Sequence, residues 1–98
     1  MANFNNLINI NKPVIVDFYA DWCQPCKMVA PILEQVKKDL GDKVKIIKIN
    51  VDKNQAISAK YNIRNIPTLM VFKNGELKFH QAGVIPAKEI KKIVLSNL

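Results

Sequence analysis

Two cysteines separated by two residues, in the tetrapeptide Cys23-Gln24-Pro25-Cys26, are the residues of this chain best suited to chemistry. Thiols at this spacing come close enough to form a disulfide and to exchange it with other thiols. The chain has no other cysteine, so a framework of structural disulfides is excluded and this pair carries all of the thiol chemistry. The sequence therefore predicts reversible dithiol–disulfide exchange.

A zinc site is the alternative use of two cysteines at this spacing. A closed structural zinc site takes four ligands, which are usually cysteine and histidine. His80 is the one other soft ligand in the chain, and its place in a predicted hairpin strand puts it on the surface. The residues therefore favour redox chemistry over zinc binding.

The segments on either side of the cysteines would hold them at the end of a strand. Residues 14–20 are apolar and rich in β-branched and aromatic side chains, which is typical of a strand buried on both faces. A helix is predicted over residues 24–40, with a bend at Pro31. Its apolar stripe is Val29, Ile32, Leu33 and Val36. Cys23 would lie at the N-terminus of this helix, where free N–H groups and the helix dipole favour a thiolate, and Cys26 would lie one turn on.

The remaining segments predict further alternation of helices and strands. They are a helix at residues 4–8, a strand at 44–50, a helix at 54–61, strands at 68–72 and 77–82, and a last helix that Pro86 opens and whose apolar stripe is Ile90, Ile93, Val94 and Leu98. Asp52 is expected to cap the 54–61 helix, and Asn74-Gly75 to turn the hairpin. This order predicts an α/β fold, a mixed sheet with helices on both faces.

The chain of 98 residues is expected to form one domain, residues 1–98, and its 49% of apolar residues favours a packed core. Met28 and Met70 should fill that core. No apolar run approaches the roughly 20 residues of a membrane span, and the first residues do not resemble a signal peptide, so a cytoplasmic protein is expected.

The formal net charge is +7, and the lysines are scattered from Lys12 to Lys92. A solvated surface is the plain interpretation of this charge, and steering of acidic protein partners is the alternative. Basic tracts with interleaved aromatic residues are lacking, so nucleic-acid binding is not expected.

Several segments, in the same order along the chain, resemble the thioredoxin family. They are residues 16–27 around the cysteines, Ala30-Pro31, residues 48–52, residues 64–68, residues 72–76 and Gly83. A lone pair of cysteines at this spacing is a weak signal, whereas this ordered set is specific and covers nearly the whole chain. The resemblance implies the thioredoxin fold.

The resemblance also implies roles for the residues at the centre of the site. Cys23 would be the nucleophile, and Cys26 would resolve the mixed disulfide. Asp17, buried behind the disulfide with a raised pKa, would accept and return the proton of Cys26. Lys48, on the neighbouring strand, would pair with Asp17 and tune it. The peptide bond before Pro67 would be cis.

A shallow, mostly apolar groove beside the cysteines would bind client proteins. The backbone of Ile66 is expected to pair with the client chain like an added strand, and Trp22 is expected to form an exposed rim. The full set of expected client-binding residues is Trp22, Gln24, Pro25, Val51, Asn65, Ile66, Pro67, Gly83 and Val84.

The implied activity is that of a protein-disulfide reductase. Such a protein reduces disulfides in client proteins, needs no cofactor beyond its own disulfide and is recharged by a thioredoxin reductase. One alternative is a thiol oxidase or isomerase of an oxidising compartment, which more often has histidine where this chain has Pro25. The other is a non-catalytic subunit of a larger assembly that uses the same fold.

The chain departs from the family pattern at Tyr19, Gln24 and Asn65, where the family usually has Trp, Gly and often Gly. Nor do the residues before Phe4 supply the extra N-terminal strand of the family. We therefore expect a four-stranded sheet with residues 44–50 on an edge. Lysines would protect this edge only in part, and the protein would be mostly monomeric.

Overall fold

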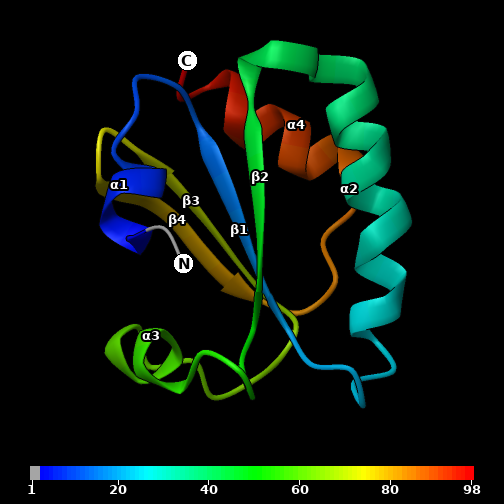
Figure 1. Cartoon of the computed structure of the whole chain (residues 1–98). Coiled ribbons are helices and arrows are strands. Elements are labelled where there is room, and N and C mark those ends of the chain that lie inside the picture. Colours follow the sequence, from blue (N-terminus) through cyan, green and yellow to red (C-terminus); the bar gives the residue numbers. More distant parts are fainter. Residues whose placement is uncertain (1–2) are drawn as a thin grey trace.

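The computed structural model describes residues 3–98, which form a four-stranded sheet with helices on both faces (Figure 1). The helices are α1 (Phe4–Ile8), α2 (Cys26–Leu40), α3 (Gln55–Lys60) and α4 (Ala87–Leu95), with a short 3-10 turn, η1 (Gly41–Lys43), after α2. The strands are β1 (Val14–Tyr19), β2 (Lys45–Asn50), β3 (Thr68–Lys73) and β4 (Glu76–Ala82). The predicted order of helices and strands is confirmed.

Strand β1, which leads to the cysteines, lies inside the sheet. The strand order is β2-β1-β3-β4, and β1 runs parallel to β2 and antiparallel to β3. In this register Asp17 lies beside Lys48 on β2 and beside Leu69 on β3. The sheet is therefore mixed, has four strands in the described chain and leaves β2 at an edge, as the sequence predicted.

Two apolar clusters, one on each face of the sheet, hold the helices against it. Ile15 belongs to the cluster under α2 and α4, while Val16 and Phe18 belong to the cluster on the face of α1 and α3. Successive residues of β1 thus point to opposite faces, and both faces are buried. By this alternation Asp17 points to the same face as Ile15, toward α2, and is a carboxylate in an otherwise apolar row.

The hairpin between β3 and β4 forms because its two turn residues accept a left-handed backbone. Asn74 has φ of 52° and Gly75 has φ of 79°, as a two-residue turn matched to the twist of the strands requires. The N–H groups of Asn74 and Gly75 also donate to the carbonyls of Ile10 and Ile8, at 2.9 and 3.1 Å. The hairpin therefore secures the end of α1 as well.

Two predicted details of the helices are wrong. Helix α2 begins at Cys26 and not at Gln24, so Cys26 is the first residue of the helix and does not lie one turn inside it. Helix α4 ends at Leu95, because the side chains of Ser96 and Asn97 bond to the carbonyl of Ile93. Leu98 is therefore outside the apolar stripe and 57% exposed.

The prediction for the methionines is half right. Met70 is fully buried in the sheet, whereas Met28 is 59% exposed. The buried stripe of α2 consists of Val29, Leu33 and Val36, and Met28 precedes it by one position, which turns its side chain toward solvent.

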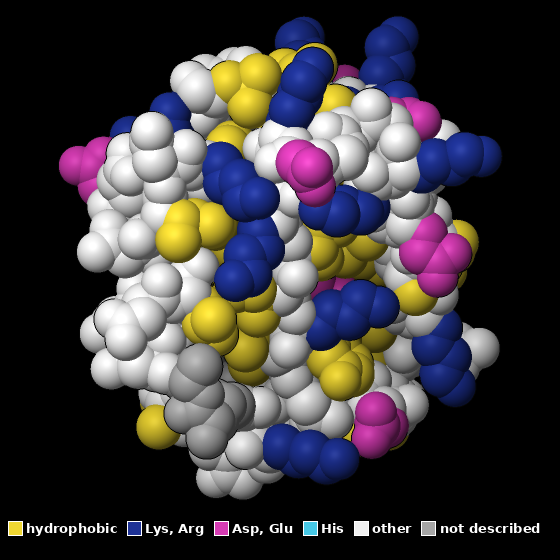
Figure 2. All heavy atoms as spheres, turned by 45° about the horizontal axis from the view of Figure 1, so that its top comes forward, with side chains coloured by type: hydrophobic (Ala, Val, Ile, Leu, Met, Phe, Trp, Pro, Cys, Tyr) yellow, Lys and Arg dark blue, Asp and Glu magenta, His cyan; other side chains and the backbone are white. Residues whose placement is uncertain are grey.

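The surface carries the excess of positive charge that the composition indicated. Figure 2 shows dark-blue basic side chains spread over the visible face, with fewer acidic ones and with yellow hydrophobic side chains between them.

Among the described residues, none of the helices is both long and apolar enough to span a membrane.

Candidate active site

Cys23, in the loop after β1, and Cys26, the first residue of α2, form a disulfide with their Cα atoms 5.3 Å apart. The N–H of Cys23 donates to the carbonyl of Ala20 at 3.2 Å, which closes the turn after the strand. The N–H of Cys26, at the start of α2, donates to Sγ of Cys23 at 3.2 Å. The helix N-terminus thus directs a backbone donor at one of the two sulfurs, that of Cys23.

Exposure does not distinguish the two cysteines in the disulfide form. Cys23 is 3% exposed and Cys26 is 7% exposed, so both side chains are buried. Both pack with Ala20, and Tyr19, Val51 and Ile66 cover this small cluster. The asymmetry of the pair therefore lies in hydrogen bonding and not in solvent contact.

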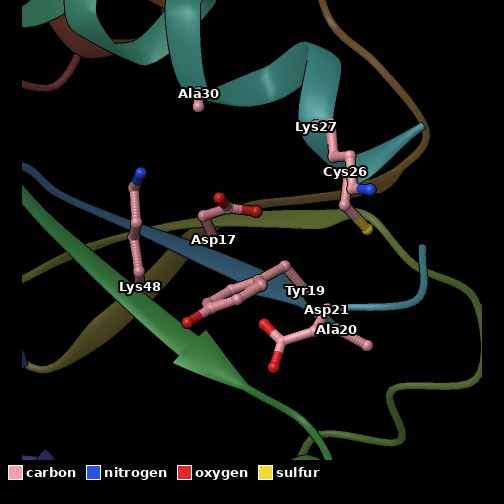
Figure 3. A pocket seen from close by; sticks show the side chains of 8 residues that line it. All are labelled: Asp17, Tyr19, Ala20, Asp21, Cys26, Lys27, Ala30 and Lys48. Atoms are coloured by element: carbon pink, nitrogen blue, oxygen red, sulfur yellow. The ribbon is translucent and has the colours of Figure 1, made fainter. Parts of the chain in front are cut away.

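A cavity behind the disulfide contains the carboxylate of Asp17 (Figure 3). Its volume is about 260 Å³, and it is lined by Asp17, Tyr19, Ala20, Asp21, Cys26, Lys27, Ala30 and Lys48. Asp17 is 3% exposed, as the sequence predicted, and its Oδ1 is buried without a hydrogen-bond partner. A buried carboxylate oxygen without a partner is costly, and here it lies in the cavity that Cys26 also lines.

Burial raises the pKa of Asp17 to about 6, although the positive charge of Lys48 acts in the opposite direction. Lys48 is exposed on the edge strand, and the ion pairs of the described chain do not include it. The sequence predicted that Lys48 pairs with Asp17. The two residues are neighbours across the sheet and share the cavity, but the lysine acts on the carboxylate through space.

On the outer side of the disulfide, Trp22 is 71% exposed and is held at its polar end. Its Nε1–H donates to Oδ2 of Asp52 at 2.9 Å. Oδ1 of the buried Asn50 in turn accepts the N–H groups of Asp52 at 2.9 Å and of Lys53 at 3.3 Å. Trp22 is thus exposed, as expected of a rim residue, and its side chain is held by a turn ordered by Asn50.

Sequence reasoning missed this support for Trp22, because it assigned Asp52 to the cap of α3. The cap position is occupied by Asn54, and the side chain of Asp52 is directed to the indole instead. The signal available was the pair of polar residues, Asn50 and Asp52, at the end of a strand parallel to β1. Carboxyl ends of parallel strands meet at one edge of a sheet.

The loop before β3 closes the other side of the site. The peptide bond between Ile66 and Pro67 is cis, as the resemblance implied. The N–H of Gly83, whose φ is 103°, donates to the carbonyl of Pro67 at 2.8 Å. The hydroxyl of Thr68 also bonds to the carbonyl of Asn65. Ile66 remains half-exposed and packs against the cysteine cluster.

The expected client-binding residues are therefore brought together unequally. Val51 and Ile66 contact the cysteine cluster, Gly83 is bonded to Pro67, and Trp22 adjoins Cys23. The other expected residues, Gln24, Pro25, Asn65 and Val84, are exposed and lie next to these in the chain.

Residues 3–98 hold no group of three or more His, Cys, Asp or Glu side chains that could bind a metal ion.

Comparison with known proteins gives one consistent result. A family model described as Thioredoxin matches residues 1–96. The thioredoxin of Rickettsia bellii is 48% identical over 92 residues, which are 94% of this chain and 88% of that protein. The thioredoxin of Haemophilus influenzae is 42% identical over 98 residues, 99% of this chain and 92% of that protein.

A solved structure, a mutant thioredoxin from Halobacterium salinarum NRC-1, has a TM-score of 0.88 at 33% identity and covers 99% of this chain and 84% of its own. The sequence, the fold and the cysteine pair thus agree with one another. The chain belongs to the thioredoxin family, and it is a protein-disulfide oxidoreductase that works by thiol–disulfide exchange.

Proposed function

We propose that Cys23 is the nucleophile and that the protein acts as a reductant of client disulfides. The hydrogen bond from the N–H of Cys26 to Sγ of Cys23 carries this assignment, because a donor at a helix N-terminus stabilises a thiolate on the sulfur that it meets. The Cys23 thiolate attacks a client disulfide, forms a mixed disulfide and releases one client thiolate. Cys26 then attacks Sγ of Cys23 and releases the second, so two electrons pass from the cysteine pair to the client.

Asp17 takes up the proton of Cys26 in the second step. Its carboxylate has an unpartnered oxygen, lines the same cavity as Cys26 and has a pKa of about 6. A base of this strength is close enough to neutrality both to accept and to return a proton. The cavity of about 260 Å³ has room for water to carry the proton between the two groups, and the charge of Lys48 keeps the pKa of Asp17 from rising further.

Clients bind over the surface around Pro67 and Trp22. The backbone of Ile66 pairs with an extended client segment next to the cysteines, in the manner of an added strand. The half-exposed position of Ile66 on the cysteine cluster supports this role. The remaining members of the surface are Trp22, Gln24, Pro25, Val51, Asn65, Pro67, Gly83 and Val84.

The working unit is one domain, residues 1–98, mostly monomeric and cytoplasmic. Its partners are disulfide-containing client proteins and a thioredoxin reductase that returns electrons to the Cys23–Cys26 disulfide. The names of its relatives support these assignments. The redox-active disulfide is its only cofactor.

Trapping of mixed disulfides tests the order of the two cysteines. Cys26→Ser leaves the nucleophile but removes the resolving thiol, so clients should remain covalently attached to it on non-reducing gels. Cys23→Ser is the matched control and should trap none. Equal trapping by both variants would overturn the assignment.

A separate measurement tests the direction of electron flow. With a thioredoxin reductase, the parent protein should reduce insulin, and its reduction potential should lie near the roughly −270 mV of reducing family members. A potential above about −180 mV would indicate an oxidase or isomerase instead.

A further inference from the structure

The outer edge of β2 offers backbone groups that nothing in the described chain pairs with. Residues 3–98 place β2 next to β1 alone. The N–H groups of Lys45 and Val51 donate to the carbonyls of Pro13 and Tyr19, at 3.0 and 2.8 Å, on the β1 side. Alternate residues of a strand direct their N–H and C=O groups to opposite edges. Those of Ile46 and Lys48 therefore point outward and can pair with a further strand.

This free stretch has defined ends. Before it, the carbonyl of Val44 accepts a hydrogen bond from Nζ of Lys37 at 2.7 Å. After it, the carbonyl of Asn50 accepts from the N–H of Lys53 at 3.2 Å and from Nδ2 of Asn54 at 3.0 Å. Only residues 45–49 remain open, so an added segment would pair with about one short strand length.

The side chains of this stretch read Lys45-Ile46-Ile47-Lys48. Ile46 and Ile47 are half-buried and extend the clusters on opposite faces of the sheet. Lys45 is half-exposed and Lys48 is exposed. The ion pairs of residues 3–98 are Lys78–Glu76 and Lys91–Asp39, so neither lysine of β2 has an acidic partner there.

A complementary strand would need carboxylates beside the lysines and apolar side chains beside the isoleucines, because directly opposite residues on paired strands contact one another. Its sequence would be acidic–apolar–apolar–acidic. The pattern reads the same in both directions, so it fits a parallel or an antiparallel segment. A second copy of this chain does not fit, since it would bring its own Lys45 and Lys48 and a further net charge of +7.

We propose that the edge of β2 binds an extended segment of a partner protein with the pattern acidic–apolar–apolar–acidic, which joins the sheet as a fifth strand. The charge of the surface agrees with an acidic partner, since basic side chains exceed acidic ones on the face shown in Figure 2. In Figure 1, β2 runs along the front of the molecule, and it forms the edge of the sheet opposite to the edge formed by β4. The added strand would not cover the client surface at Pro67, but its carboxylate beside Lys48 would adjoin the cavity that contains Asp17.

Nuclear magnetic resonance of the oxidised full chain tests this proposal with a defined probe. The probe is the blocked hexapeptide Thr-Glu-Val-Val-Glu-Thr, added to about 1 mM because a short strand binds weakly. We expect the amides of Ile46 and Lys48 to shift and to gain protection from exchange. A peptide of the same composition with the order Val-Glu-Glu-Val at its centre, and one with N-methylated backbone amides, should bind at least about fivefold more weakly.

Two charge reversals complete the test. Lys45→Glu should weaken peptide binding by about tenfold, with thiol–disulfide exchange unchanged. Lys88→Glu, an equal change at an exposed position of α4, should weaken it by less than about twofold. An equal loss of peptide affinity in both variants would show that the peptide is bound by general charge attraction and would contradict the proposal. Thermal unfolding of each variant shows whether the variant is folded.

Three other results would overturn the proposal. The first is an absence of amide shifts on β2, and the second is equal binding of the reordered peptide. The third is concentration-dependent dimerisation of the free chain with protection of the β2 amides, which would assign the edge to a second copy.

Discussion

An aspartate lies on each side of the disulfide, and the two carboxylates differ in burial and in hydrogen bonding. On the inner side, Asp17 is buried, has an oxygen without a partner and has a pKa raised by burial. On the outer side, Asp52 accepts the indole N–H of Trp22, and its own N–H is held by Asn50. The inner carboxylate is thus protonated more readily than an ordinary one, whereas the outer one is held in a hydrogen bond to the indole.

Carboxylates near the same cysteines thus acquire different properties from their surroundings alone. A buried, unpartnered carboxylate costs stability and gains basicity. A hydrogen-bonded carboxylate adds a modest stabilisation and loses freedom to react. Substitutions on the two sides should therefore differ in sign as well as in size.

The largest effect is expected from Asp17→Asn on the inner side. The pKa of Asp17 is about 6 in the folded protein, against 3.8 for the ordinary group. The folded protein therefore binds this proton more tightly than the unfolded chain does, so its stability falls as the pH rises from about 4 to about 6 and is constant above. Asp17→Asn removes this loss. The oxidised variant should be more stable by about 3 kcal/mol at pH 7, and the gain should disappear at about pH 3.

Denaturant unfolding of the parent and the variant across this pH range measures the difference. Reduction of a client disulfide at pH 7 should fall by about tenfold or more in the same variant, because it lacks the base. A gain in stability that does not change with pH would show that Asp17 is not the titrating group.

A smaller effect is expected on the outer side, from Asp52→Ala. The variant loses the acceptor for the indole N–H, which should cost about 1 kcal/mol of stability and increase the mobility of Trp22. Trp22 is the only tryptophan, so fluorescence anisotropy reports this directly. Asp52→Asn keeps an oxygen acceptor and is the control. Equal anisotropy in the parent, Asp52→Ala and Asp52→Asn would show that Asp52 does not position Trp22.

The smallest effect is expected from Lys48→Gln, which removes the positive charge that lowers the pKa of Asp17. The pKa of Asp17 should rise by less than about one unit, since Lys48 is exposed and solvent screens its charge. The upper end of the pH range over which stability falls should rise by the same amount as this pKa. The control is Lys45→Gln on the same strand, which should not change this pH. A shift of equal size in the Lys45 variant would show that net charge is the cause.

The sequence predicted the fold well because its signals were local and consistent. The apolar run before the cysteines, Asn74-Gly75 and the buried stripe of α2 each occur where the structure uses them. Helix ends were less accurate. The start of α2 and the end of α4 are accompanied by local hydrogen bonds of Cys26, Ser96 and Asn97, which periodicity does not reveal.

The site was predicted less completely than the fold. The resemblance supplied both the burial of Asp17 and the cis bond at Pro67. The link from Asn50 through Asp52 to Trp22 joins segments about 30 residues apart, and composition does not indicate which of two plausible partners a carboxylate takes. The equal burial of the two cysteines also depends on tertiary packing by Val51 and Ile66.

The central place of β1 in the sheet has a consequence for the chain during its synthesis. β1 is the first strand to be made, but its neighbours are β2 and β3, and the last residue of β3 is Lys73. At roughly 5–20 residues per second, the ribosome needs about 3–12 s to make the intervening chain. During that time β1 has at most one of its two neighbours, β2, and can associate with other nascent chains. A product that stalls before Thr68 therefore has both cysteines but neither a finished sheet nor the far wall of the site.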